Sequence, residues 1–179
     1  GFRCYERRMN LIKRLFKEKD EAIWNDDCVE ILLDPLGTGK NYYHFIINSN
    51  GAIYDARDDD VKWESNIKVG ISLEKDFWIA EIQLPFKDFG YIPKGGEIWR
   101  VNLCREEKPD NELSSLFLTP DGFCHPENFG EILFERKKAE GFDYQIQGIQ
   151  YKGDDRIKVL LNNISNQVQD LKFSINCFT

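Results

Sequence analysis

The 179-residue sequence has no long apolar run, no excess of basic residues and no Cys-x-x-Cys pair. Without a stretch of about 18 apolar residues, the sequence predicts no membrane span. The net charge of −7 disfavours nucleic acids as partners, because they bind clusters of lysine and arginine. The spacing of the five cysteines does not match zinc or thioredoxin motifs. Three of them, Cys4, Cys28 and Cys104, lie in strand-like runs, where small buried thiols are common.

The sequence also lacks a glycine-rich phosphate loop and long helices that alternate with strands, which excludes a nucleotide-binding α/β fold. What it contains instead is a series of short runs of β-forming residues separated by turn sequences such as "NSNG" and "IPKGGE". We predict an all-β, jelly-roll-like antiparallel β-sandwich. Its expected strands cover residues 28–34, 42–48, 52–56, 67–73, 78–84, 98–104, 115–118 and 130–135.

The pattern also predicts a domain division. Residues 1–136 form the first sandwich, which is expected to lack its first strands because "GFRCYE" reads as the end of a strand. The polar residues 137–141 are expected to be a linker. Residues 142–179 then start a second, immunoglobulin-like β domain, although three strands could also extend the first sandwich. The basic segment 7–19 is interpreted as a short amphipathic helix or an ordered loop.

The stretch "IWNDDCVEILLDP" raises the question of function, because its strand carries the carboxylate Glu30 in its middle. Strand side chains alternate between faces, and this strand has one apolar face and one mixed face. Three other strands sort in the same way, so polar planar groups gather on the mixed faces: Glu30, His44, Asn48, Glu81, Gln83, Arg100 and Asn102. Such a set indicates a concave site for a polar ligand. A salt bridge between Glu30 and Arg100 is an equally good interpretation.

Five stretches together resemble the family 9 carbohydrate-binding modules over about residues 2–134. They are "IWNDDCVEILLDP", "NYYHFIINSNGAIYDAR", "WIAEIQLPFKDFG", "WRVNLCREE" and "HPENFGEILFE". The resemblance implies a non-catalytic β-sandwich that binds sugars and is joined to other domains of a glycan-degrading or cell-surface protein. It also implies a location outside the cytoplasm, either periplasmic, extracellular or at the cell surface.

The resemblance further implies roles for particular residues. Trp24 matches the first aromatic ring of the family's sugar clamp, and Glu30 matches the carboxylate that binds sugar hydroxyls. Phe123 stands where the family has a second clamp tryptophan. The family's arginine aligns with Ile46, and Arg100 is expected to replace it. His44 and Asn102 complete the candidate ligand-binding set on the mixed face.

Other interpretations of the function stay open. Glu30 and Glu81 are candidates for a glycosidase acid–base pair. Haem binding would need axial ligands, for which the chain offers Met9, His44 and His125. A structural or protein-interaction domain without a sugar ligand is the main alternative. No cofactor is expected apart from structural calcium, whose weak candidate ligands are Asp55, Asp58 and Asp60.

Overall fold

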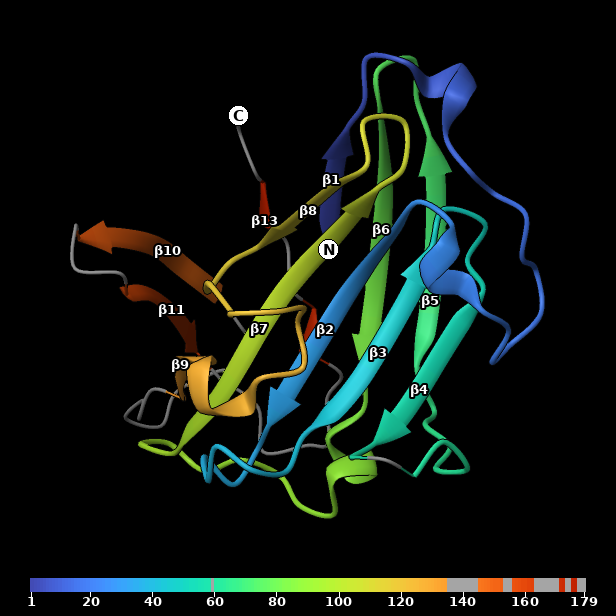
Figure 1. Cartoon of the computed structure of the whole chain (residues 1–179). Helices are drawn as coiled ribbons and strands as arrows, with labels where there is room; N and C mark the ends of the chain where they lie inside the picture. The colour runs from blue at the N-terminus through green and yellow to red at the C-terminus, as the bar shows by residue number, and fades with distance from the viewer. Residues whose placement is uncertain (59, 135–144, 153–155, 163–170, 173–174, 177–179) are drawn as a thin grey trace.

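The computed structural model describes residues 1–58, 60–134, 145–152, 156–162, 171–172 and 175–176 of the chain. Two β-sheets dominate it, and their mostly antiparallel pairing confirms an all-β sandwich (Figure 1). In the first sheet β6 pairs with β1, β5 and β12, and β1 also pairs with β13. The second sheet runs in the order β10-β11-β9-β7-β2-β3-β4, with β8 paired to β7. We call these the β6 sheet and the β7 sheet, each after its central strand.

The strands and short 3-10 helices follow one another without a long helix between them. The strands are β1 Phe2–Tyr5, β2 Cys28–Asp34, β3 Tyr43–Asn48, β4 Ile53–Arg57, β5 Lys68–Leu73, β6 Phe77–Leu84, β7 Ile98–Glu107, β8 Glu112–Ser115, β9 Gly130–Phe134, β10 Gln145–Lys152, β11 Arg156–Asn162, β12 Leu171–Lys172 and β13 Ile175–Asn176. The 3-10 helices are η1 Met9–Leu11, η2 Ile23–Asn25, η3 Phe86–Phe89 and η4 Pro126–Asn128. None of the helices in the described part of the chain has the length and apolar composition that a bilayer crossing requires.

The main core lies between the two sheets and is built by period-two alternation. Val29, Ile31 and Leu33 of β2 point into it, and so do alternate residues of β3, β6 and β7. Trp78 and Trp99 are its largest fully buried side chains. The apolar faces expected from the sequence are therefore confirmed. Their mixed faces point to the outside of the two sheets.

Loops cover part of the outer face of the β7 sheet. Two small apolar clusters form there. In one, Ile23 packs with Cys28 and Ile46. In the other, Phe129 packs with Leu32 and Cys104. These clusters cover the outward residues Cys28 and Leu32 of β2, whereas its inward residues Val29, Ile31 and Leu33 are buried in the main core.

The basic segment 7–19 contains only the single turn η1 and is otherwise an ordered loop. Two buried carboxylates hold it against the sheet. Asp26 accepts hydrogen bonds from the amides of Leu15 and Phe16, each at 2.9 Å, and Asp27 accepts one from the Lys13 amide at 2.7 Å. These backbone amides are satisfied by side chains, so no helix is needed to pair them. Because Asp26 and Asp27 lie between η2 and β2, the same contacts fix the start of β2.

The C-terminal strands pair with both sheets of the first sandwich. β11 runs parallel to β9, and β10 pairs with β11. β12 pairs with β6, and β13 runs parallel to β1. This pairing does not confirm a second immunoglobulin-like domain, so the division at residue 142 stays a prediction. The expected linker, residues 137–141, and Cys177 lie outside the described residues.

Candidate functional site

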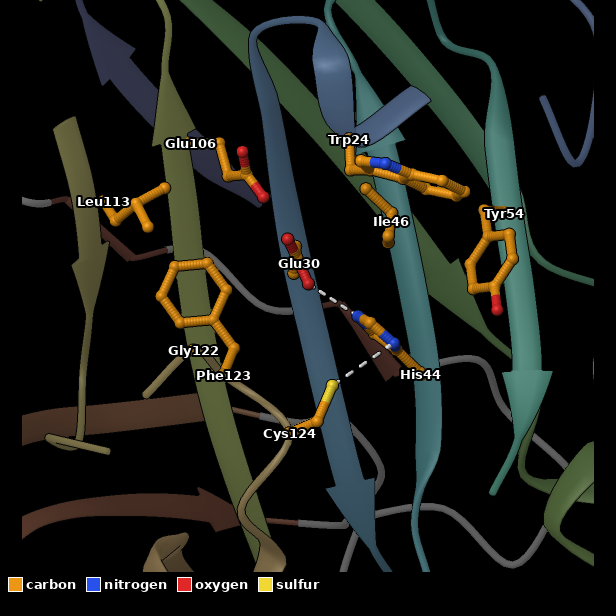
Figure 2. A pocket seen from close by; sticks show the side chains of 10 residues that line it. All are labelled: Trp24, Glu30, His44, Ile46, Tyr54, Glu106, Leu113, Gly122, Phe123 and Cys124. Atoms are coloured by element: carbon orange, nitrogen blue, oxygen red, sulfur yellow. Dashed lines mark hydrogen bonds and ion pairs between the residues drawn. The ribbon is translucent and has the colours of Figure 1, made fainter. Parts of the chain in front are cut away.

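A pocket of about 270 Å³ opens on the outer face of the β7 sheet, between the two apolar clusters. Side chains of β2, β3, β4, β7 and β8 form its floor and sides, and η2 and the loop before η4 supply the rest (Figure 2). The lining residues are Trp24, Glu30, His44, Ile46, Tyr54, Glu106, Leu113, Gly122, Phe123 and Cys124. The pocket is thus assembled from segments that are far apart in the sequence.

Four of the six ligand-binding candidates from the sequence line this pocket, namely Trp24, Glu30, His44 and Phe123. Glu30 on β2 lies opposite Ile46 of β3, so His44 is its diagonal neighbour, and Glu30 lies near the centre of the floor. Figure 2 shows Trp24 on one side of Glu30 and Phe123 on the other. Their roles toward a ligand remain predictions.

The other two candidates, Arg100 and Asn102, do not line the pocket. The Arg100 guanidinium donates to the carbonyls of Pro126 and Glu127, at 3.3 and 3.1 Å. Asn102 is fully buried, and its amide group bonds the backbone of Phe117 in both directions at 3.1 Å. Both side chains hold the loops that follow β8.

The alternative salt bridge between Glu30 and Arg100 is wrong. Across the β2–β7 ladder, Glu30 lies opposite Cys104, whereas Arg100 lies opposite Asp34. The ionic partner of Glu30 is His44, whose Nε2 lies 2.6 Å from Glu30 Oε2. Strand alternation correctly placed Arg100 on the same face, but the register separates it from Glu30 by four positions along the strand.

The proposed acid–base pair of Glu30 and Glu81 is also wrong. Glu30 is on β2 and Glu81 is on β6, which belong to different sheets. Both residues point away from the shared core, so they lie on opposite outer faces of the sandwich. Gln83 is also on β6, so it does not share the mixed face that contains Glu30.

Aromatic rings give the pocket its apolar walls. Trp24 is 41% exposed although its neighbour Ile23 is fully buried, so η2 is anchored by one side chain and presents the other. The Tyr54 ring meets Trp24 edge to face, with 5.7 Å between the ring centroids. Tyr54 makes a similar contact with the His44 ring at 5.9 Å. Trp24 is therefore held in place while its ring stays accessible.

A chain of three titratable groups crosses the floor. His44 Nε2 bonds Glu30 at 2.6 Å, and His44 Nδ1 lies 3.9 Å from the Sγ atom of Cys124. Burial lowers the pKa of His44, but the hydrogen bonds to Cys124 and Glu30 outweigh it and raise this pKa to about 9. Burial raises the pKa of the Cys124 thiol, but the contacts with His44 and Tyr42 outweigh it and lower this pKa. The geometry therefore favours an imidazolium between a carboxylate and a thiolate.

A metal ion fits the pocket floor less well. Ligand atoms of Cys28, Glu30 and Glu106 lie within 4.8 Å of one another. Burial, however, raises the pKa of the Cys28 thiol, so a metal ion would have to displace a firmly held proton to gain a thiolate ligand. The ammonium group of Lys108 already contacts the Glu106 carboxylate. The cluster thus has a suitable spacing but an unsuitable charge.

The three weak calcium candidates have protein partners of their own. Asp55 is buried and lies 2.8 Å from the ammonium group of Lys19. Asp58 accepts from the Tyr42 amide at 2.8 Å, and Asp60 accepts from the Lys62 amide at 3.1 Å. Calcium at this loop stays an untested prediction.

The histidines proposed for haem have other partners as well. His44 bonds Glu30 and Cys124, and His125 bonds Asp121 and Glu127 at 2.6 and 3.1 Å. Both ring nitrogens of each histidine are thus engaged, which leaves neither ring ready to be an axial ligand.

Sequence reasoning did not select Tyr54, Glu106 or Cys124 for the site. Strand alternation could have found the first two, because Glu106 continues the series from Asn102 and Cys104, and Tyr54 lies opposite Ile46. For Cys124 no such signal exists. It lies in a loop, and its partner His44 is 80 residues away in the sequence.

No protein-family profile and no curated protein matches the sequence. Solved structures do resemble it. A family 9 carbohydrate-binding module of Caldicellulosiruptor kristjanssonii in complex with glucose is 18% identical, with a TM-score of 0.56 over 76% of this chain and 69% of that one. A family 9 module of the same organism in complex with cellotriose is 18% identical, with a TM-score of 0.55 over 75% of this chain and 67% of that one. A proposed carbohydrate-binding protein of Bacteroides uniformis ATCC 8492 is 19% identical, with a TM-score of 0.55 over 69% of this chain and 68% of that one. The chain therefore shares the β-sandwich fold of family 9 modules.

Proposed function

We propose that the protein is a non-catalytic carbohydrate-binding module and that the pocket around Glu30 holds a sugar ring. One observation carries the proposal: an accessible tryptophan stands beside a buried carboxylate in a concave site. The electron-rich face of an indole ring attracts the C–H groups on the apolar face of a sugar. A carboxylate accepts hydrogen bonds from the hydroxyl groups at the edge of that sugar.

The residues divide these tasks among themselves. Trp24 stacks on the sugar, and Phe123 bounds the opposite side of the pocket (Figure 2). A carboxylate has about four lone-pair sites, so Glu30 accepts from a hydroxyl group while one oxygen stays bonded to His44. The ligands of the solved modules, glucose and cellotriose, make β-linked glucose units the first sugars to test.

Titration calorimetry of the protein with glucose, cellotriose and a panel of other oligosaccharides tests the proposal. Trp24→Ala is the decisive variant, and we expect it to weaken binding at least about tenfold, because a stacked aromatic ring contributes roughly 1–3 kcal/mol to binding. Tyr5→Ala is a matched control. Tyr5 is 39% exposed, its ring lies 5.7 Å from that of Phe77, and β1 belongs to the other sheet.

Equal binding by the Trp24→Ala and Tyr5→Ala variants would show that a sugar, if bound, occupies another surface. No binding of any glycan by the folded wild-type protein would favour a structural or protein-interaction domain. Attachment to other domains and a location outside the cytoplasm remain expectations from the family resemblance.

A further inference from the structure

We propose that Cys124 is an activated thiol, and that the Glu30–His44–Cys124 chain makes it a modification site for small uncharged disulfides. The proposal does not depend on sugar binding, because it concerns the reaction of one sulfur atom. Three observations carry it: the geometry of the three groups, the exposure of Cys124 and the charge around the pocket.

The geometry is that of a nucleophile, a base and a group that orients the base. His44 bonds Glu30 at 2.6 Å through Nε2, which leaves Nδ1 directed to Cys124 Sγ at 3.9 Å (Figure 2). The Glu30 side chain is only 4% exposed. Its buried charge needs a positive partner, and a protonated imidazole next to a sulfur atom in turn favours the thiolate. The thiolate is the form of cysteine that attacks disulfides.

Exposure distinguishes Cys124 from the other described cysteines. Cys4, Cys28 and Cys104 are buried, whereas Cys124 is exposed at the wall of the pocket. Burial also raises the pKa of the Cys28 and Cys104 thiols, so they stay protonated and unreactive. A thiol reagent is therefore expected to react at one of these four positions only.

The charges around the pocket define the chemical class of the reagent. Besides His44, the titratable groups that affect Cys124 are the Tyr42 hydroxyl and the Glu30 carboxylate, and the latter raises the pKa of the thiol. Glu106 lies further along the same pocket, next to the ammonium group of Lys108. With Cys124 as a thiolate, the three negative groups Cys124, Glu30 and Glu106 exceed the two positive partners His44 and Lys108, so an anionic disulfide is repelled and an uncharged one is not.

The reaction is thiol–disulfide exchange. The Cys124 thiolate attacks one sulfur of the reagent, a bond forms between the two sulfur atoms, and the original S–S bond breaks. Cys124 is thereby oxidised to a mixed disulfide, while the other half of the reagent is reduced and leaves as a thiolate. That leaving thiolate takes up the proton that Cys124 had transferred to His44, so the imidazole ends neutral and the protons balance.

Dithiodipyridine, an uncharged disulfide, is the probe, and the absorbance of the released thiopyridone gives the rate. Every sample carries Cys177→Ser, because Cys177 lies outside the described residues. The variants are Cys124→Ser, His44→Gln and, as a matched control, His125→Gln. His125 is the chain neighbour of Cys124 but bonds Asp121 and Glu127 instead of the thiol. Mass spectrometry of the labelled protein identifies the modified residue.

We expect one rapid reaction, located at Cys124 and absent in Cys124→Ser. An ordinary thiol with a pKa near about 8.5 is ionised to only about 0.3% at about pH 6. At this pH the wild type is therefore expected to react roughly tenfold faster than His44→Gln, with His125→Gln unchanged. The anionic reagent dithiobis(nitrobenzoate) is expected to react with Cys124 more slowly than dithiodipyridine does, and added salt is expected to reduce this difference between the two reagents.

Two results would overturn the proposal. One is modification that occurs mainly at Cys4, Cys28 or Cys104. The other is a wild-type rate that rises with pH as for an ordinary thiol. The second result needs no substitution in the pocket, so it decides the matter even if His44→Gln does not fold.

Discussion

Replacing Glu30 by glutamine is the most direct test of the Glu30–His44–Cys124 chain, which we call the charge relay. The substitution removes the charge of Glu30 and keeps the shape of its side chain. Burial opposes the charge on His44, yet the hydrogen bonds to Cys124 and Glu30 raise its pKa from 6.5 to about 9. The side chains of His44 and Glu30 are 13% and 4% exposed, so solvent screens their interaction weakly. Protonated His44 therefore stabilises the folded protein.

The size and the sign of this effect follow from linkage. The pKa of His44 changes from 6.5 in the unfolded chain to about 9 in the folded one. At about 1.4 kcal/mol per pH unit, this difference corresponds to at most roughly 3 kcal/mol of unfolding free energy. Because the folded pKa is the higher one, this stability is fully present below pH 6.5 and is lost as the pH rises through about 9. Glu30→Gln should remove about 1–3 kcal/mol near about pH 6, and much less near about pH 10.

Urea unfolding at the two pH values measures the difference, and an NMR titration of the imidazole signals gives the pKa of His44 in each protein. Glu127→Gln is the matched control, since Glu127 bonds the other histidine, His125, at 3.1 Å and outside the pocket lining. This control should show only a small stability change at either pH, because solvent screens an ion pair whose carboxylate side chain is 59% exposed. The charge relay would be refuted if Glu30→Gln cost the same at both pH values, or if it left the pKa of His44 unchanged.

Two further predictions concern stability. Burial and a hydrogen bond with Glu6 raise the pKa of Glu107 from 4.5 to about 7, so the stability linked to its proton is lost as the pH rises through about 7. Glu107→Gln should therefore raise the unfolding free energy by about 1–3 kcal/mol above that pH but hardly below pH 4.5, and a pH-independent change in urea unfolding would contradict this. A Cβ added at Gly130 would overlap the Phe117 ring, whereas one at Gly70 meets its nearest atom at 4.0 Å. Thermal melts should show Gly130→Ala to be destabilised by about 1–3 kcal/mol relative to Gly70→Ala.

The strands and their core faces could be predicted because they depend on local alternation. The predicted strand 28–34 coincides with β2, and Val29, Ile31 and Leu33 face the core as expected. Strand ends were less accurate, since β8 ends at Ser115 where the prediction began. Polar loop residues and edge positions carry no alternation, so their pairing depends on the rest of the sandwich.

Alternation says which side of its own sheet a residue faces, but it does not say to which sheet the strand belongs. For this reason Glu81 was grouped with Glu30 although β6 and β2 are in different sheets. It also gives no register between strands, which is why Arg100 was paired with Glu30 instead of lying opposite Asp34. Long-range loop contacts, such as that of Cys124 with His44, depend on both sheet and register.

The buried position of Glu30 accounts for the chemistry of the whole pocket floor. A carboxylate whose side chain is 4% exposed on a sheet face requires a cation. The β2–β3 register supplies His44, which lies opposite Leu32, two positions along the strand from Glu30. Once Nε2 of His44 bonds Glu30, Nδ1 must donate to another acceptor, and the loop before η4 supplies Cys124. The thiolate of Cys124 therefore follows from the charge of Glu30, so one substitution, Glu30→Gln, should alter both the pKa of His44 and the reactivity of Cys124. Trp24→Ala, in contrast, should alter sugar binding alone, because its ring has no part in the relay.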